Sequence, residues 1–169
     1  MLIYVGYLAL YALKGGDMDK KDFQIIRELQ RDGRLTNQEL AERVNLSPSP
    51  CLRRLRRLEH DGVITGYTAL VDQKAFGLPL TVFVRIRLER HAKDLVKAFE
   101  DRIRRIDAIL DCFLTTGGAD YILRVIVPSL DEYEDFVRQQ LHGLPGLQSI
   151  DTSFAFGVVK QSQMFPAVR

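Results

Sequence analysis

The sequence contains little cysteine, and its two cysteines are far apart. Cys51 and Cys112 form no CxxC pair, and no histidine stands at metal-ligand spacing from either of them. Disulfide frameworks and zinc sites need several such residues at characteristic spacings. The sequence therefore predicts two partly buried thiols, no bound metal, and a protein of the reducing cytoplasm.

The chain also lacks an apolar run long enough to span a membrane. Residues 1–13 (MLIYVGYLALYAL) are apolar, but a transmembrane helix needs about 20 such residues, and Lys14 follows the run where a signal peptide has its basic residue first. Three interpretations remain: an upstream start codon ahead of a natural Met18, an element that caps another surface, or a weak membrane contact. We favour the first, so we expect residues 1–16 to be a non-native or disordered extension and expect no membrane partner.

No catalytic constellation can be assembled from this sequence. It contains no phosphate-binding loop, no metal cluster and no paired nucleophile and base. An enzyme is therefore the least supported class of function, and no cofactor is expected.

The formal net charge of +2 is too small to indicate a nucleic-acid partner on its own. The distribution of charge is more informative. Between Ser47 and His60 four arginines stand against one acid, Glu59. A positive field concentrated in so short a segment is typical of a phosphate-binding surface, and a solvated face without a partner is the alternative.

The segment from residue 17 to residue 64 predicts three helices. Asp19 can cap the first helix, and Thr36 forms a capping box with Glu39 at the start of the second. The apolar set of the first helix is expected to be Phe23, Ile26 and Leu29. Three short helices with a tight connection before the third are typical of a helix-turn-helix domain of winged-helix-like form.

The third helix is the candidate DNA-reading element. We expect it to begin at Ser47, because the prolines of SPSP then occupy the first and third helical positions, where proline is tolerated. Helical periodicity puts four side chains on the packed side, namely Cys51, Leu52, Leu55 and Leu58. The opposite side carries Ser49, Arg53, Arg56, Arg57 and His60, with Pro50 and Arg54 at its margin. That side faces outward, where a helix-turn-helix protein meets the major groove.

Arginine suits this face because its guanidinium group can bind O6 and N7 of guanine together. Arg53 is predicted to contact bases, and the other three arginines are predicted to hold phosphates. The full set of predicted DNA-binding residues is Ser47, Ser49, Pro50, Arg53, Arg54, Arg56 and Arg57. Double-stranded DNA is the expected partner.

A second unit follows a short connection. Residues 65–78 are interpreted as a linker strand, residues 79–163 as a ligand-sensing and oligomerisation domain, and residues 164–169 as a tail. The second unit alternates strand and helix periodicities in the order β-α-β-β-α-β, with Gly117-Gly118 as a hairpin turn and LQSIDTSFAFGVVK as the closing strand. The chain is thus predicted to be an α+β protein, a helix-turn-helix domain followed by a ferredoxin-like domain.

Three sequence stretches carry a resemblance to a known family: DGRLTNQELAERVNLSPSPCLRRLRRLEHDGVITGYTALVD, LTTGGADYILRVIVP and the ending VVKQS. Over about Asp17 to Gln163 the chain closely resembles the Lrp/AsnC family of leucine- and asparagine-responsive transcriptional regulators, also called feast/famine proteins. The resemblance implies homodimers formed through the sheets, assembly into octamers or open helices, and an amino-acid effector bound at interfaces between dimers.

The resemblance also implies an effector site, near the turn that corresponds to Thr116 through Tyr121 and near the last strand. The predicted effector-binding residues are Thr116, Gly117, Gly118, Asp120 and Ser153. Gly118 departs from the family pattern, in which many members carry an acidic residue. Backbone N–H groups of the turn can bind a carboxylate and Asp120 can accept from an ammonium group, whereas a plain hairpin turn is the alternative interpretation of the glycines. Asp120 carries more weight than the glycines, because a carboxylate that opens a strand has less structural reason to be there.

The leading hypothesis is therefore a dimeric, sequence-specific DNA-binding regulator of transcription that responds to an amino acid. Two alternatives make different predictions. A small-molecule-binding module that docks on a partner protein would show no salt-sensitive DNA binding. An architectural DNA-binding protein would bind all duplexes alike and need no effector.

Overall fold

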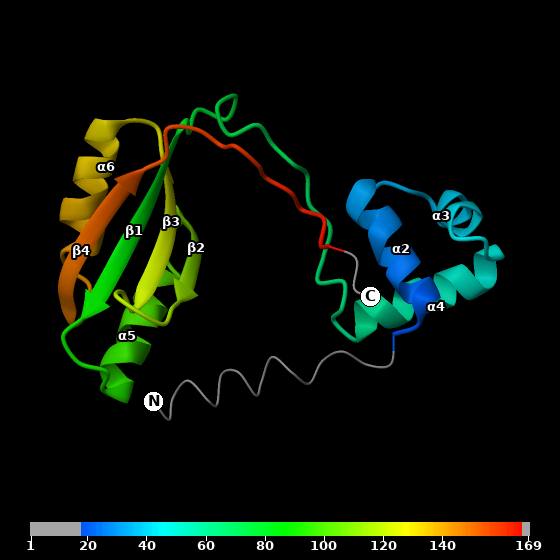
Figure 1. Cartoon of the computed structure of the whole chain (residues 1–169), viewed down its shortest axis with the longest axis horizontal. Helices are drawn as coiled ribbons and strands as arrows, with labels where there is room; N and C mark the ends of the chain where they lie inside the picture. The colour runs from blue at the N-terminus through cyan, green and yellow to red at the C-terminus, as the bar shows by residue number, and fades with distance from the viewer. Residues whose placement is uncertain (1–17, 167–169) are drawn as a thin grey trace. The chain divides into compact units, whose positions relative to one another are not determined.

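The computed structural model of the protein describes residues 18–166. These residues group into two compact units: the head, which comprises residues 18–69 and 160–166, and the sheet domain, which comprises residues 70–159 (Figure 1). Residues 160–163, expected in the second domain, group with the head. The predicted extension 1–16 and residues 167–169 of the tail lie outside the described residues. No helix within residues 18–166 combines the length and the apolar character needed to cross a bilayer.

Three helices build the head: α2 (Lys20–Arg31), α3 (Asn37–Arg43) and α4 (Pro48–His60). Their starts follow the predicted capping chemistry. The Asp19 side chain accepts hydrogen bonds from two N–H groups of α2, and Thr36 and Glu39 form a reciprocal capping box at the start of α3. Ser47 is the N-cap residue of α4, with a proline at the first helical position, as predicted.

The core of the head lies between these helices and is made by Ile25, Leu40, Ala41, Val44, Cys51 and Leu58. The expected apolar set of the first helix was partly wrong, because Phe23 is 41% exposed while Ile25 is fully buried. Asp22 is also fully buried, and Asp22, Ile25 and Leu29 share one helical face by their spacing. The face of α2 that packs inward is therefore rotated toward Asp22.

Residues 65–78 contain no strand, contrary to the predicted linker strand. A strand needs a neighbouring segment whose N–H and C=O groups pair with its own, and no other part of residues 18–166 pairs with this segment. Leu70 and Val71 are consequently exposed. The described part of the head likewise consists of helices and turns without a strand.

The sheet domain follows the predicted β-α-β-β-α-β order. Its elements are β1 (Leu80–Leu88), α5 (Lys93–Ile103), β2 (Ile109–Leu114), β3 (Tyr121–Val127), α6 (Leu130–Phe136), the π-helical segment η1 (Val137–Leu141) and β4 (Leu147–Phe154). The strands are all antiparallel in the order β2-β3-β1-β4, which is the ferredoxin-like arrangement. The closing strand is shorter than the predicted LQSIDTSFAFGVVK, because its partner β1 begins at Leu80 and offers no pairing beyond Thr81.

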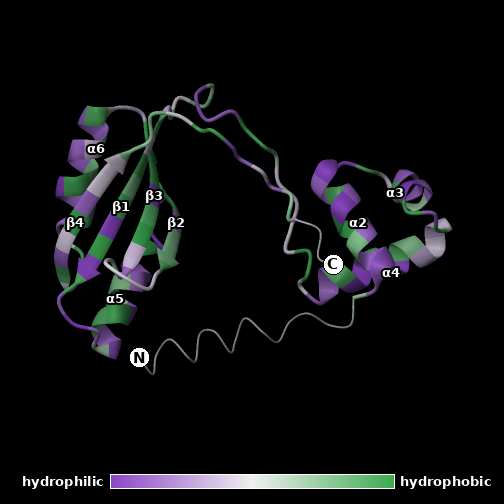
Figure 2. Ribbon diagram, in the orientation of Figure 1, coloured by the Kyte–Doolittle hydropathy of each residue, from purple (hydrophilic) through white to green (hydrophobic). Residues whose placement is uncertain are grey.

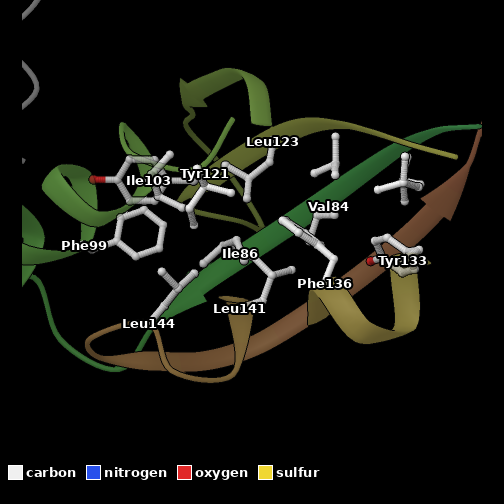
Figure 3. Close-up of a cluster of buried hydrophobic side chains, with 14 of the residues drawn as sticks. Val84, Ile86, Phe99, Ile103, Tyr121, Leu123, Tyr133, Phe136, Leu141 and Leu144 are labelled. Carbon is white, nitrogen blue, oxygen red and sulfur yellow. The ribbon is translucent and has the colours of Figure 1, made fainter. Parts of the chain in front are cut away.

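One face of the sheet carries the core of this domain. Figure 3 shows side chains of the strands, including Val84, Ile86 and Leu123, packed against Phe99 of α5 and Phe136 of α6. Burial of each such side chain contributes roughly 1.5–3 kcal/mol. Hydropathy alternates along the strands (Figure 2), so the other side of the sheet is mixed in polarity. We call that side the open sheet face; strand register assigns to it Phe83, Arg85, Arg87, Asp111, Phe113, Ile122, Arg124, Ile126, Ser149, Asp151 and Ser153.

Candidate DNA interface and effector turn

The predicted outward face of α4 is present in the structure. Five of the predicted DNA-binding residues are exposed: Ser47, Ser49, Arg53, Arg56 and Arg57. Pro50 lies at its margin and is half-buried, while Cys51 and Leu58 point into the core of the head. Ser47 makes no side-chain capping hydrogen bond, so its hydroxyl group is available to a ligand at the start of the helix.

Arg53 and Arg56 are the arginines of α4 that have no partner in the described part of the chain. Neither side chain makes a hydrogen bond or an ion pair within residues 18–166. The two residues are three positions apart, and Ser49 precedes Arg53 by four, so all three lie on one side of the helix. This face combines positive charge with a hydroxyl group near a helix N-terminus.

Arg54 and Arg57 point elsewhere, although both were predicted to hold phosphates. The Nη1 atom of Arg54 lies 3.0 Å from Oδ1 of Asp22 and 2.7 Å from Oδ2 of Asp19. The Nη2 atom of Arg57 lies 2.5 Å from Oδ2 of Asp22. Both guanidinium groups therefore bind carboxylates of the head, and their availability to DNA is reduced.

Asp22 is the functional candidate that sequence reasoning missed. Its carboxylate is fully buried and also accepts a hydrogen bond of 3.0 Å from the backbone N–H of Asp19. A sequence signal was present, because Asp22 stands three residues after the capping Asp19 and completes a capping box. The contact with α4 could not be read from this local pattern, since more than thirty residues separate Asp22 from Arg54 and Arg57.

The predicted effector turn connects β2 to β3. Its ends are joined by hydrogen bonds from Thr115 N to Asp120 O (2.8 Å) and from Thr115 Oγ1 to Ala119 O (2.9 Å). Gly117 has a φ of 122°, a backbone conformation that residues with a Cβ atom rarely adopt. The backbone N–H groups of residues 116–119 donate no hydrogen bond to any described residue. The turn thus presents backbone donors that are unpaired within the described residues, which is compatible with a carboxylate-binding loop and with a plain hairpin turn alike.

Asp120 has structural partners, so the expectation that it has little structural reason to open the strand was wrong. Its Oδ2 accepts a hydrogen bond of 2.8 Å from the backbone N–H of Leu88, and its Oδ1 lies 2.8 Å from Nε2 of His91. Desolvation raises the pKa of Asp120, but the Leu88 N–H, the His91 ring and the charge of Arg87 together outweigh it and lower the pKa below 3.8. The Asp120 carboxylate thus links the end of β1, through the Leu88 N–H, to the start of β3.

Ser153 lies apart from this turn within one copy of the chain. It is the register partner of Phe83, and its hydroxyl lies 3.3 Å from Nη1 of Arg85. The backbone of Asp120 meets β1 at Ile86 instead. Three residues of a strand span roughly 10 Å. One copy of the chain therefore does not bring Ser153 together with residues 116–120.

Comparison with known proteins identifies both units. Residues 18–65 match the model of the winged helix-turn-helix DNA-binding domain, and residues 81–165 match that of the Lrp/AsnC ligand binding domain. The chain is 43% identical over 148 residues to the leucine-responsive regulatory proteins of Escherichia coli K12 and Klebsiella pneumoniae, which covers 88% of this chain and 90% of each relative. The chain belongs to the Lrp/AsnC family.

Solved Lrp/AsnC structures share the fold. A transcriptional regulator from Neisseria meningitidis in complex with L-Met is 40% identical, with a TM-score of 0.83 over 88% of this chain and 96% of that one. An AsnC family regulator from Agrobacterium tumefaciens is 33% identical, with a TM-score of 0.84 over 88% of this chain and 97% of that one. The predicted fold class is confirmed, and the chain is a DNA-binding transcriptional regulator of the Lrp/AsnC type with a ligand-binding domain.

Gly118 is the residue of the turn that Arg87 contacts. The Nε atom of Arg87 donates a hydrogen bond of 3.1 Å to the Gly118 carbonyl group. A Cβ atom at this position would lie 4.0 Å from Nη2 of Arg87, so any side chain here would begin beside that guanidinium group. The Gly118 carbonyl thus holds the Arg87 side chain against the turn.

Proposed function

We propose that the protein acts as a homodimer whose two α4 helices read a pseudo-palindromic DNA site, and that an amino acid bound near residues 116–120 controls this binding. Recognition helices of such dimers enter successive major grooves about 34–36 Å apart. The observation that carries the proposal is that Arg53 and Arg56, on the outward face of α4, have no partner among residues 18–166.

The proposed roles on α4 follow from distance to the helix N-terminus, which enters the groove first. Arg53, one turn after Ser49, binds guanine through O6 and N7. Arg56 lies further along the helix and binds phosphate. Ser47 and Ser49 offer hydroxyl groups to phosphate or base edges, and Pro50 supports the helix start with an apolar contact.

The open sheet face is the proposed dimer surface. Its apolar side chains include Phe83, which is 39% exposed, and Phe113, which is 57% exposed. Its charges are of both signs, because Arg85 faces Asp151 at 3.6 Å and Arg124 binds Asp111. A two-fold dimer uses the same patch on both copies, and a patch with both signs of charge is compatible with itself. Assembly of such dimers into octamers or larger forms follows the family expectation.

The proposed effector is an amino acid, the class of ligand bound by the Neisseria meningitidis relative. The N–H groups of residues 116–119 and the guanidinium of Arg87 would bind its carboxylate. Each oxygen of Asp120 accepts one hydrogen bond and keeps a lone pair for the ammonium group. Ser153 joins the site only if a second copy supplies it. We place this regulator in the cytoplasm and assign it no catalytic activity and no cofactor.

Fluorescence anisotropy tests the DNA-reading part of this proposal. The protein is titrated against labelled duplexes of its own upstream promoter and of a scrambled sequence, at about 50 and about 200 mM salt. We expect tighter binding to the promoter and a steep loss of affinity at the higher salt. Equal binding of both duplexes would favour an architectural DNA-binding protein, and absence of binding would favour a module that docks on another protein.

A further inference from the structure

The four arginines of α4 lie in two different environments. The side chains of Arg54 and Arg57 are 27% and 48% exposed, and both bind the fully buried Asp22, one at each carboxylate oxygen. Arg54 also binds Asp19. Two arginines and two aspartates thus form a locally neutral cluster between α2 and α4.

The cluster resists rotation of α4 about its own axis. Arg54 and Arg57 are three residues apart, so the Asp22 carboxylate binds side chains from two successive turns of α4. Rotation by one residue position, about 100°, would replace Arg53 and Arg56 on the outward face by Arg54 and Arg57. It would also strip a buried carboxylate of its charged partners, which is strongly unfavourable.

We propose that Asp22 is a positioning residue for DNA recognition: it retains Arg54 and Arg57 against α2 and thereby leaves Arg53 and Arg56 as the arginines of α4 that bind DNA. The inference rests on the proposed role of α4 in reading DNA. It divides the four arginines into two that neutralise carboxylates, Arg54 and Arg57, and two that bind DNA, Arg53 and Arg56.

The division has a measurable consequence in the salt dependence of DNA binding. The slope of log K against log salt is about −0.9 for each phosphate that a protein cation neutralises. Arg56→Ala should reduce the slope by about 0.9, or about 3.5-fold in affinity between 50 and 200 mM salt, whereas Arg57→Ala should leave the slope unchanged. The two variants remove the same charge from adjacent positions, so the difference isolates the effect of pairing with Asp22.

Asp22→Asn tests the positioning role directly. The amide keeps the size of the side chain but removes its charge, so half-exposed Arg57 is released toward solvent. We expect the slope to steepen by about 0.9 and the preference for promoter over scrambled duplex to fall. Asp32→Asn is the matched control, because it removes the same charge from the end of α2 and can still accept the 3.0 Å hydrogen bond from the Arg34 N–H.

The experiment is anisotropy titration of the full chain and these four variants over a salt series, with circular dichroism to confirm folding. A steeper slope for Asp22→Asn, with an unchanged slope for Asp32→Asn, supports the inference. If Asp22→Asn does not fold, the comparison of Arg56→Ala with Arg57→Ala decides. Equal slope losses in those two variants, with intact wild-type binding, would overturn the inference alone. A wild-type chain that binds neither duplex would overturn the proposed function and the inference with it.

Discussion

Each unit of the protein contains an aspartate whose hydrogen bonds favour its charged form: Asp19 in the head and Asp120 in the sheet domain. The N–H of Asp22 lowers the pKa of Asp19, and the guanidinium of Arg54 and the N–H of Lys21 lower it further. The pKa of Asp120 is lowered as well, because its three favourable partners outweigh desolvation. Both carboxylates therefore prefer the charged form in the folded chain.

The contribution of Asp120 to the stability of the fold should depend on pH and be lost in acid. A lowered folded-state pKa means that the stabilisation is complete above the unfolded value of about 3.9 and is lost as the pH falls below it toward the folded pKa. Asp120→Asn should flatten the loss of thermal stability between about pH 5 and about pH 3. Thermal unfolding followed by circular dichroism measures this, with Asp107→Asn, an exposed carboxylate, as the control. A profile for Asp120→Asn that runs parallel to that of the wild type would contradict the assignment.

Arg53 should determine sequence preference more than overall affinity. A bidentate contact with guanine discriminates by about 1–3 kcal/mol, so Arg53→Ala should reduce the preference for promoter over scrambled duplex by roughly 5- to 150-fold. Arg56→Ala should weaken binding to both duplexes by similar factors. Competition titrations with the two duplexes separate these outcomes. Equal losses for both duplexes in Arg53→Ala would make Arg53 a phosphate contact.

Caps and turns explain why the elements of this chain begin and end where they do. Asp19 and Thr36 fix the starts of α2 and α3, Ser129 accepts from the Glu132 N–H at the start of α6, and Gly117 allows the turn between β2 and β3. These are short-range interactions, so their sequence signatures are local.

The two glycines of the effector turn should respond differently to substitution. Gly117 has a φ of 122°, whereas a Cβ atom at Gly118 meets only the end of the Arg87 side chain, at 4.0 Å. Strained backbone of this kind costs about 1–3 kcal/mol, so Gly117→Ala should destabilise the sheet domain by that amount and Gly118→Ala by much less. Urea unfolding of the full chain gives both values. Equal destabilisation would mean that the turn differs from the one described.

Most of the fold could be predicted from the sequence because it depends on local periodicity and capping. The helix starts at Asp19, Thr36 and Ser47 and the β-α-β-β-α-β order are of this kind. Features that depend on partners distant in the chain could not be predicted. The pairing of Asp22 with Arg54 and Arg57 joins residues more than thirty positions apart, and residues 65–78 have a strand pattern without a partner strand within residues 18–166.

The candidate sites were predicted to different degrees. The outward placement of Arg53 and Arg56 followed from helical spacing and an N-terminal boundary that prolines define. The structural role of Asp120 was missed, because its partner, the Leu88 N–H, lies at the end of another strand. Strand register, which decides such contacts, depends on the whole sheet.

The whole molecule is expected to work as an assembly, because Phe83 and Phe113 of the open sheet face are exposed within the described part of the chain and Ser153 lies apart from residues 116–120. Two copies packed through that face would bury Phe83 and Phe113 and bring two heads into one particle. Paired heads can read a two-fold site, which a single helix-turn-helix cannot do.

Introducing a charge on the open sheet face tests this assembly. Phe83→Glu would place a carboxylate in the apolar part of the proposed interface, where burial of an unpaired charge is costly. We expect monomers in analytical ultracentrifugation and a large loss of promoter affinity. Leu130→Glu is the control, because Leu130 is 60% exposed on α6 and lies outside the open sheet face. Dimers that persist in Phe83→Glu would place the interface elsewhere.

The central claim is that DNA binding by the head is controlled by an amino acid bound to the sheet domain. The most direct measurement is promoter anisotropy with each amino acid added in turn, followed by calorimetric titration of any active one with and without promoter DNA. Coupling between two sites is reciprocal, so the amino acid that changes promoter affinity should itself bind with an affinity changed by the same factor when DNA is present. Promoter binding that no amino acid alters would contradict the claim.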